Sequence, residues 1–233
     1  MRAARAAIVT VLLSTVLVST VPLQGQVPGD VSFRILEHGA PIGDARVTVA
    51  RADAGWTLTG SGTLAGSVGL EVRRFELTYD AAWRGRAFSI ELASSTSHVI
   101  AHAIVAVLGA RTRTDIVLEK EVRPVFNHVS PHAVFLPDYV LPAFIALPPR
   151  LAGAGPGDQL PAFVPLRTEF ALMEDAVERV FVAGASGPIA ATHWRLRFDN
   201  GPPSPIDLWE GDGHLLRVDL VEDALSMVRS DLR

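Results

Sequence analysis

Hydrophobic and polar side chains alternate with a period of two in several short runs beyond residue 30. In RRFELTYD (73–80), Phe75, Leu77 and Tyr79 fall on one side of an extended chain, and charged or polar residues fall on the other. This alternation predicts a β-strand with one buried face and one exposed face. The same alternation occurs at 87–94, 193–199 and 215–220.

Residues typical of turns separate these runs. Glycine, proline, asparagine and aspartate gather at 38–44, 60–66, 199–205 and 211–213. Short turns join antiparallel strands, because a parallel connection needs a long crossover. The pattern therefore predicts a mainly β protein built as an antiparallel meander.

One segment departs from the period of two. In PDYVLPAFIALPPRL (137–151), Val140, Phe144 and Leu147 recur at helical spacing, and Asp138 is placed to cap the helix. We expect the helix to end near Leu147, because a residue that precedes a proline is disfavoured in the α region. The segment predicts a short helical insert between two β-rich stretches.

The first 25 residues have the organisation of a secretory signal peptide. Two arginines precede an uncharged apolar run at 6–23, and Gly25 is a small residue suited to a cleavage site. The mature protein is then expected to begin near Gln26, to form a single β-rich domain over 26–233, and to be periplasmic or secreted. The alternative is a retained membrane anchor, because the run is almost long enough to span a bilayer.

Composition narrows the classes of partner. Hydrophobic residues make up 48% of the chain and charged residues 20%, which excludes disorder and coiled coil. The absence of cysteine excludes disulfides and a lipidated N-terminal cysteine. A net charge of −4 argues against nucleic acid, which requires a clustered basic face. We expect an apolar small molecule or an envelope protein as partner, with the membrane met only transiently through the signal peptide.

Four histidines are candidate metal ligands, since imidazole suits zinc. They form two pairs with a spacing of four: His98 with His102, and His128 with His132. Pro131 prevents the second pair from forming the helical arrangement of zinc proteases, and no glutamate follows His128. A zinc site built from all four is an alternative, whereas the principal expectation is no metal and no cofactor.

No other motif identifies a catalytic residue. GASGP (184–188) lacks the spacing and the following helix of a nucleophile elbow. GSGTLA (60–65) has the spacing of a dinucleotide-binding fingerprint, but a strand-like run follows it. Asp212 and Gly213 fit a hairpin turn better than a calcium loop. The remaining catalytic alternative is a metal-dependent or acid/base hydrolase that uses His128, His132 and Asp138.

Two segments carry a resemblance to known proteins: HVSPHAVFLPDYVLPAFIALPPRL (128–151) and DLWEGDGHLLRVDLVEDALSMVRSDL (207–232). In them the chain resembles uncharacterised secreted β-rich proteins of Gram-negative bacteria and, more distantly, the half-barrels of periplasmic lipoprotein carriers. The resemblance implies a strongly curved antiparallel sheet, a half-barrel or open barrel, with one short apolar helix packed on it. It also implies a groove for an acyl chain or apolar partner, and it transfers no catalytic residue.

The predicted helix is apolar on nearly every side, so more than one of its faces must be covered. We expect it to lie in the concavity of the curved sheet, at the edge of an apolar groove. The expected function is a non-catalytic cell-envelope protein that binds an apolar, lipid-like ligand or a protein partner in this groove. The candidate groove residues are Tyr139, Val140, Phe144, Leu147, Trp194 and Trp209.

Overall fold

The chain consists mainly of β-strands in a computed structural model, which describes residues 26–66, 69–94, 100–108, 111–118, 121–138, 140–154, 157–165, 169–199 and 205–232. The first strands are Gly29–Glu37 (β1), Ala40–Ala52 (β2), Gly55–Leu64 (β3), Leu70–Asp80 (β4), Gly85–Ser94 (β5), Ile100–Leu108 (β6), Arg111–Leu118 (β7) and Glu121–His128 (β8). The later strands are Val134–Phe135 (β9), Gln159–Phe163 (β10), Glu169–Gly184 (β11), Gly187–Asp199 (β12), Ile206–Gly211 (β13), His214–Leu220 (β14) and Leu225–Arg229 (β15). Between β9 and β10 lie the 3-10 helix η1 (Leu141–Ala146) and the α-helix α1 (Leu147–Leu151).

All of these strands belong to one continuous sheet. From β8 at one edge the strand order runs back along the chain to β1, continues with β15, and runs back again to β9 at the other edge. The pairs are antiparallel, with the exception of β9 and β10, which run parallel. The predicted antiparallel meander is confirmed.

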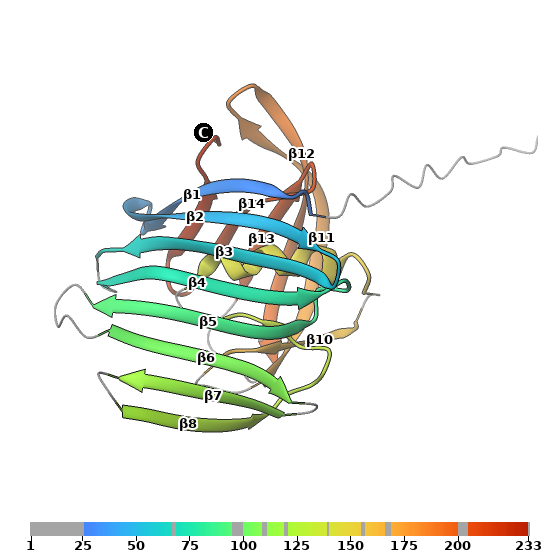
Figure 1. Cartoon of the computed structure of the whole chain (residues 1–233). Helices are drawn as coiled ribbons and strands as arrows, with labels where there is room; N and C mark the ends of the chain where they lie inside the picture. The colour runs from blue at the N-terminus through green and yellow to red at the C-terminus, as the bar shows by residue number, and fades with distance from the viewer. Residues whose placement is uncertain are drawn as a thin grey trace, which may run out of the picture.

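The sheet curves around the helical segment. Figure 1 shows β2 to β8 as a layer in front and β11 to β14 as a layer behind, with η1 and α1 between them. The edge strands β8 and β9 lie at opposite ends of the strand order, so the sheet is not closed into a barrel. The predicted fold class, mainly β with a curved sheet and one short helix, is confirmed.

The strand faces follow the predicted alternation. Phe75, Leu77 and Tyr79 are buried in β4, as are Trp194 and Leu196 in β12, and the residues between them are exposed or half-buried. Burial of each large apolar side chain contributes about 1.5–3 kcal/mol to the free energy of folding. The concave faces of both layers therefore enclose one common core.

The helical segment differs from the prediction at both ends. Asp138 does not cap it, because η1 begins only at Leu141 and has no side-chain cap. Pro148 and Pro149 do not end it either, because they lie in the first turn of α1, which continues to Leu151. Proline is tolerated there, since the first N–H groups of a helix need no intrahelical partner. No helix in the described ranges is both long and apolar enough to cross a membrane.

The turn predicted at 60–66 is wrong over most of its length, because β3 continues through residue 64. Gly60 instead allows strands to pack closely. A Cβ atom there would lie 2.2 Å from the carbonyl oxygen of Arg46 and 2.7 Å from the ring of Phe75. The hairpin turn predicted at 211–213 is confirmed between β13 and β14, where residues 212 and 213 both have positive φ.

The buried apolar side chains form two clusters. The main cluster fills the concavity and joins both layers to the helical segment through residues such as Leu77, Leu196 and Ile145. The second cluster is much smaller and consists of Ala191, Leu216, Val228 and Leu232. It packs against one face of the outer part of the β11–β12 hairpin, through Val180, Val182 and Ile189.

Candidate functional site

Four of the predicted groove residues lie in the main cluster. Val140, Phe144 and Leu147 in the helical segment and Trp194 in β12 are all buried, with exposed fractions of 1%, 7%, 0% and 4%. The crevice beside η1 that Val140 helps to line has a volume of about 10 Å³. That is about the space one water molecule occupies. An apolar groove along this helix stays a prediction.

The other two groove candidates are placed differently. Trp209 in β13 is half-buried and packs against the second cluster. Its ring stacks on His193 at 4.3 Å between centroids, and the guanidinium carbon of Arg217 lies 5.2 Å from its centroid. Tyr139 lies outside the described residues. The fold thus brings four of the six candidates into one cluster and places Trp209 elsewhere.

The histidine candidates lie at one edge of the sheet and in the loop that follows it. His128 ends β8, His132 follows it, and both are exposed, while Asp138 is half-buried. His98 and the side chain of His102 lie outside the described residues. The described part of the chain contains no group of three or more histidines and carboxylates that could hold a metal ion. The four-histidine zinc site and the hydrolase site stay predictions.

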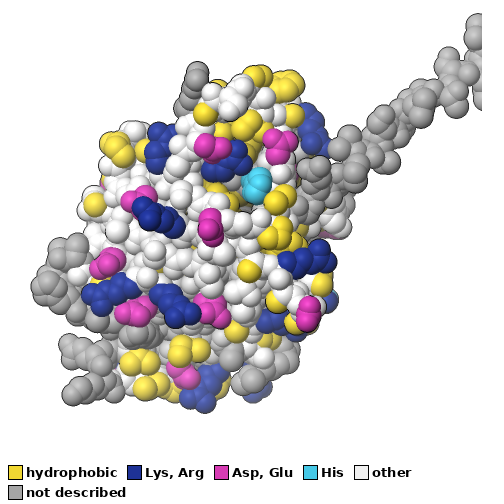
Figure 2. Space-filling view, turned by 45° about the horizontal axis from the view of Figure 1, so that its top comes forward, with side chains coloured by type: hydrophobic (Ala, Val, Ile, Leu, Met, Phe, Trp, Pro, Cys, Tyr) yellow, Lys and Arg dark blue, Asp and Glu magenta, His cyan; other side chains and the backbone are white. Residues whose placement is uncertain are grey.

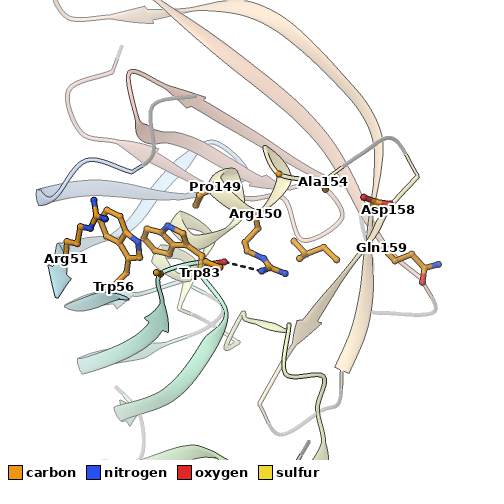
Figure 3. Close-up of a pocket in the computed structure, with 12 residues that line it drawn as sticks. Arg51, Trp56, Trp83, Pro149, Arg150, Ala154, Asp158 and Gln159 are labelled. Atoms are coloured by element: carbon orange, nitrogen blue, oxygen red, sulfur yellow. Dashed lines mark hydrogen bonds between the residues drawn. The ribbon is translucent and has the colours of Figure 1, made fainter. Parts of the chain in front are cut away.

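A cavity of about 620 Å³ opens at the mouth of the concavity. It lies between the β4–β5 turn and the start of β10, with the end of α1 at its base (Figure 3). Its volume is in the range of small-molecule sites, about 300–1,000 Å³. Half of the lining residues are alanine, glycine, proline or leucine, and the others are Arg51, Trp56, Trp83, Arg150, Asp158 and Gln159.

Two tryptophans form one wall of this cavity. Trp56 in β3 and Trp83 in the β4–β5 turn stack with ring centroids 4.6 Å apart and planes inclined by 20° (Figure 3). Tyr79 packs against Trp83 at 5.5 Å, and its hydroxyl donates to the carbonyl oxygen of Phe135 at 3.2 Å. Burial raises the pKa of Tyr79, so this hydroxyl stays protonated. The pair is therefore a rigid apolar wall, and only a small part of it is open to the cavity, since Trp56 is 8% exposed and Trp83 is 4% exposed.

Asp80 holds Trp83 in an unusual backbone conformation. Trp83 has a φ of +58°, which costs about 1–2 kcal/mol for a residue with a Cβ atom. The Asp80 Oδ1 accepts from the N–H groups of Ala82 and Arg84 at 2.9 and 3.0 Å. Its Oδ2 accepts from Arg84 Nε and Arg86 Nη2 at 2.7 and 2.8 Å. Burial raises the pKa of Asp80, but these hydrogen bonds outweigh burial and leave that pKa below its ordinary value.

Arg150 in α1 enters the cavity from its base. Its Nη1 donates to the carbonyl oxygen of Ala82 at 3.1 Å, drawn as the dashed line in Figure 3, and its Nη2 donates to that of His132 at 2.9 Å. Its Nε is buried and has no hydrogen-bond partner among the described residues. Burial, and then the charge of Arg84, lower the pKa of Arg150, yet a guanidinium stays charged at neutral pH. A buried donor without a partner costs about 1–3 kcal/mol.

A second guanidinium stands on the other side of the tryptophan pair. The Arg51 Cζ, at the end of β2, lies 5.4 Å from the centroid of the Trp56 ring. Asp158 and Gln159 lie across the cavity from the tryptophans, near the start of β10 (Figure 3). The cavity thus combines an apolar wall, two guanidinium groups, one carboxylate and one amide, so its cations outnumber its anion. This combination suits a molecule with an apolar body and an anionic group.

Sequence reasoning missed this site entirely, because its residues come from four separate parts of the chain. The only local signal is a tryptophan beside a turn, which occurs in ADAGW (52–56) and again in AAWRG (81–85). Neither segment has the spacing of a binding motif. In the register of β3 on β4, Trp56 pairs with Tyr79 near the end of β4. This pairing places the Trp56 ring beside the ring of Trp83, which lies in the β4–β5 turn.

Comparisons with known proteins do not assign a family. No protein-family model and no curated protein matches the sequence. Among solved structures, the chain is similar to a DUF1089 family protein from Pseudomonas aeruginosa, with 16% identity and a TM-score of 0.28 over 99% of this chain and 97% of that one. A TM-score of 0.28 is too low to transfer a function. The resemblance to periplasmic lipoprotein carriers stays a prediction from the sequence.

Proposed function

We propose that the chain is a non-catalytic binding protein of the cell envelope, and that its cavity takes a small amphipathic molecule with an anionic group. The apolar part of the molecule contacts the accessible parts of Trp56 and Trp83 together with the alanine, proline and leucine side chains of the lining, and the anionic group accepts hydrogen bonds from Arg150. The observation that carries the proposal is the guanidinium of Arg150, which lines a cavity of ligand size and has no carboxylate partner among the described side chains.

The charge of the cavity supports an anionic group rather than a neutral one. Among the described side chains, Arg150 makes hydrogen bonds only to two neutral carbonyl oxygens, so no carboxylate neutralises it directly. Arg51 adds a second positive charge beside Trp56. Hydrogen bonds to charged groups contribute about 1.5–3 kcal/mol, so an anion satisfies Arg150 better than a hydroxyl does.

The lining of the cavity supports binding rather than catalysis. Among the described lining residues, Asp158 is the single carboxylic acid, and none is a serine, threonine, cysteine or histidine. Nucleophilic catalysis needs a hydroxyl, thiol or amine beside a base, and acid/base catalysis needs a positioned pair of titratable groups. The predicted signal peptide adds the expectation that the ligand is met in the cell envelope.

Two dyes with the same ring system test this proposal. Anilinonaphthalene sulfonate carries an anionic sulfonate, and N-phenylnaphthylamine has the same rings without it. The proposal expects the sulfonate dye to bind the folded protein with one-to-one stoichiometry, and at least about tenfold more tightly than the neutral dye. Equal affinity for the two dyes would contradict an anion site.

Matched variants locate the binding. Arg150→Gln and Arg51→Gln should each weaken sulfonate-dye binding, Arg150→Gln by about tenfold or more because it removes a buried charge-assisted donor. Arg217→Gln is the control, since Arg217 lies over Trp209 much as Arg51 lies over Trp56, but away from the cavity. Loss of dye binding in Arg217→Gln, with binding kept in Arg150→Gln, would place the site elsewhere.

A further inference from the structure

The outer end of the β11–β12 hairpin has no charged side chain. Residues 180–191 read VFVAGASGPIAA, in which Ser186 is the one polar side chain. Phe181 is 78% exposed, and Val177, four residues earlier in the same strand, is 53% exposed. A contiguous apolar patch marks an interaction surface, whereas singly exposed apolar residues are normal, so the uncharged run 180–191 around Phe181 is the informative feature.

This end of the hairpin projects beyond the rest of the sheet. Strand β10 pairs with β11 only as far as Met173, and β13 pairs with β12 only from Thr192 inward. Residues 180–184 and 187–191 therefore pair with each other, apart from a bridge between Gly184 and Leu232. Figure 1 shows the hairpin standing above β1 at the top of the molecule, and Figure 2, which brings that end forward, shows hydrophobic side chains gathered at the top.

One face of the projecting end is fixed to the body, and the other is open. Val180, Val182 and Ile189 pack against the second cluster. The N–H of Ala185 at the tip donates to the carbonyl oxygen of Asp231 at 3.2 Å, beside the Gly184–Leu232 bridge. Phe181 faces the other way, and its cross-strand partner Ala190 is also exposed. The tip is thus a supported protrusion whose outer face has no cover within the described chain.

The charged side chains at the base of the hairpin are largely engaged with each other. The ion pairs are Arg195–Asp207 at 3.0 Å, Arg197–Asp175 at 2.7 Å and Arg229–Asp231 at 2.6 Å. A hydrogen bond of 2.8 Å joins His193 to Glu178, and Arg179 donates to the Thr192 hydroxyl at 2.8 Å. The tip therefore presents no concentrated positive charge to anionic headgroups. Any attraction to a lipid surface must come mainly from its apolar side chains.

The described chain begins beside this hairpin. The N–H of Val27 donates to the carbonyl oxygen of Gly213 in the β13–β14 turn. Gly211, the last residue of β13, lies against Ala190, whose carbonyl oxygen is 2.6 Å from the position of a Cβ on Gly211. In the sequence, the uncharged apolar run 6–23 ends just before Gln26. While it is attached, the predicted signal peptide thus precedes the domain at the same end as the apolar tip.

We infer that the hairpin tip, residues 180–191, inserts into the interfacial region of a lipid bilayer, with Phe181 as its main anchor. A bilayer rather than a second copy of the chain is the occupant, because a stable dimer buries about 1,200–2,000 Å², and the tip is a narrow protrusion whose one large exposed apolar side chain is Phe181. The sequence alone predicts membrane contact only through the signal peptide, and the hairpin tip adds a second contact through the folded domain. The tip and the cavity share no residue, so this inference and the proposed function can fail independently.

Flotation with phosphatidylcholine vesicles tests the inference on the folded chain that begins at Gln26. The wild type should float with the vesicles, and Phe181→Ser should reduce the partition by about tenfold, since it removes most of the buried apolar area. Phe126→Ser is the matched control, because Phe126 is 64% exposed on the edge strand β8. Flotation should change little when salt is raised or when phosphatidylglycerol is added.

A site-specific fluorophore reports whether the tip itself enters the bilayer. The chain contains no cysteine, so Ala185→Cys and the control Arg123→Cys on β8 each offer one labelling site. An environment-sensitive dye at position 185 should brighten and shift to the blue with vesicles, and the dye at 123 should not. Absence of flotation, flotation that survives Phe181→Ser, or a Phe181-dependent dimer without vesicle binding would each overturn the inference.

Discussion

Removal of the Asp80 carboxylate should open the turn that presents Trp83. Asp80→Ala takes away the acceptor of two backbone N–H groups and two guanidinium groups. The N–H groups of Ala82 and Arg84 are then left without an acceptor in a partly buried turn, and each such loss costs about 1 kcal/mol or more. The two guanidinium contacts are partly exposed and contribute less.

Together these losses predict that Asp80→Ala lowers the free energy of unfolding by about 3 kcal/mol. Asp80→Asn keeps a carbonyl oxygen in the position of Oδ1 and should cost only about 1–2 kcal/mol. Asp115→Ala is the control, because its carboxylate pairs with one half-exposed arginine on β7, and it should cost less than about 1 kcal/mol. Urea denaturation followed by tryptophan fluorescence measures all three.

The same carboxylate gives the prediction a pH dependence. The pKa of Asp80 is below its ordinary value of 3.8 in the folded protein, so its stabilisation is complete above pH 3.8 and is lost as pH falls through the folded pKa. The difference in stability between wild type and Asp80→Asn should shrink over that range. Two results would show that Asp80 does not hold the turn. One is an Asp80→Ala variant as stable as Asp115→Ala, and the other is an Asp80→Ala variant that keeps the circular-dichroism exciton signal of the stacked Trp56 and Trp83.

Two further substitutions test the core and a half-buried acid. Phe144→Ala should lower the free energy of unfolding by about 3–5 kcal/mol in chemical denaturation, because Phe144 is 7% exposed in the main cluster; a cost below about 1 kcal/mol would show that it lines an open groove instead. Burial raises the pKa of Glu210 above its ordinary 4.5, so wild type should lose stability relative to Glu210→Gln as pH rises from 4.5 through the folded pKa. Thermal unfolding across that pH range measures this, and a constant difference would contradict it.

The strands could be predicted from the sequence because each has to bury one face. Phe75, Leu77 and Tyr79 alternate with polar residues, and β4 buries all three. The position of the helical segment could be predicted, but its ends could not. Proline breaks a helix in its interior but is favourable in its first turn, and Pro148 and Pro149 lie in the first turn of α1. The sequence does not reveal that α1 begins a new turn just before them.

The cavity could not be predicted, because its residues acquire their roles only through the sheet register. Gly60, outside the cavity, depends on the register in the same way: it looks like part of a turn in the sequence, and in the fold it lets a neighbouring strand and the Phe75 ring approach closely. The positive φ of Trp83 cannot be predicted from the neighbouring residues. The hydrogen bonds to Asp80 impose it only once β4 and β5 pair. Arg150 is an ordinary surface residue in the sequence and a buried donor in the fold.

The crystal structure of the complex with anilinonaphthalene sulfonate tests the central proposal most directly. We expect the rings against Trp56 and Trp83, with a sulfonate oxygen within hydrogen-bond distance of the Arg150 guanidinium, about 2.7–3.2 Å. A dye seated against Phe144 in the concavity, or bound on the outer surface with this cavity empty, would contradict it.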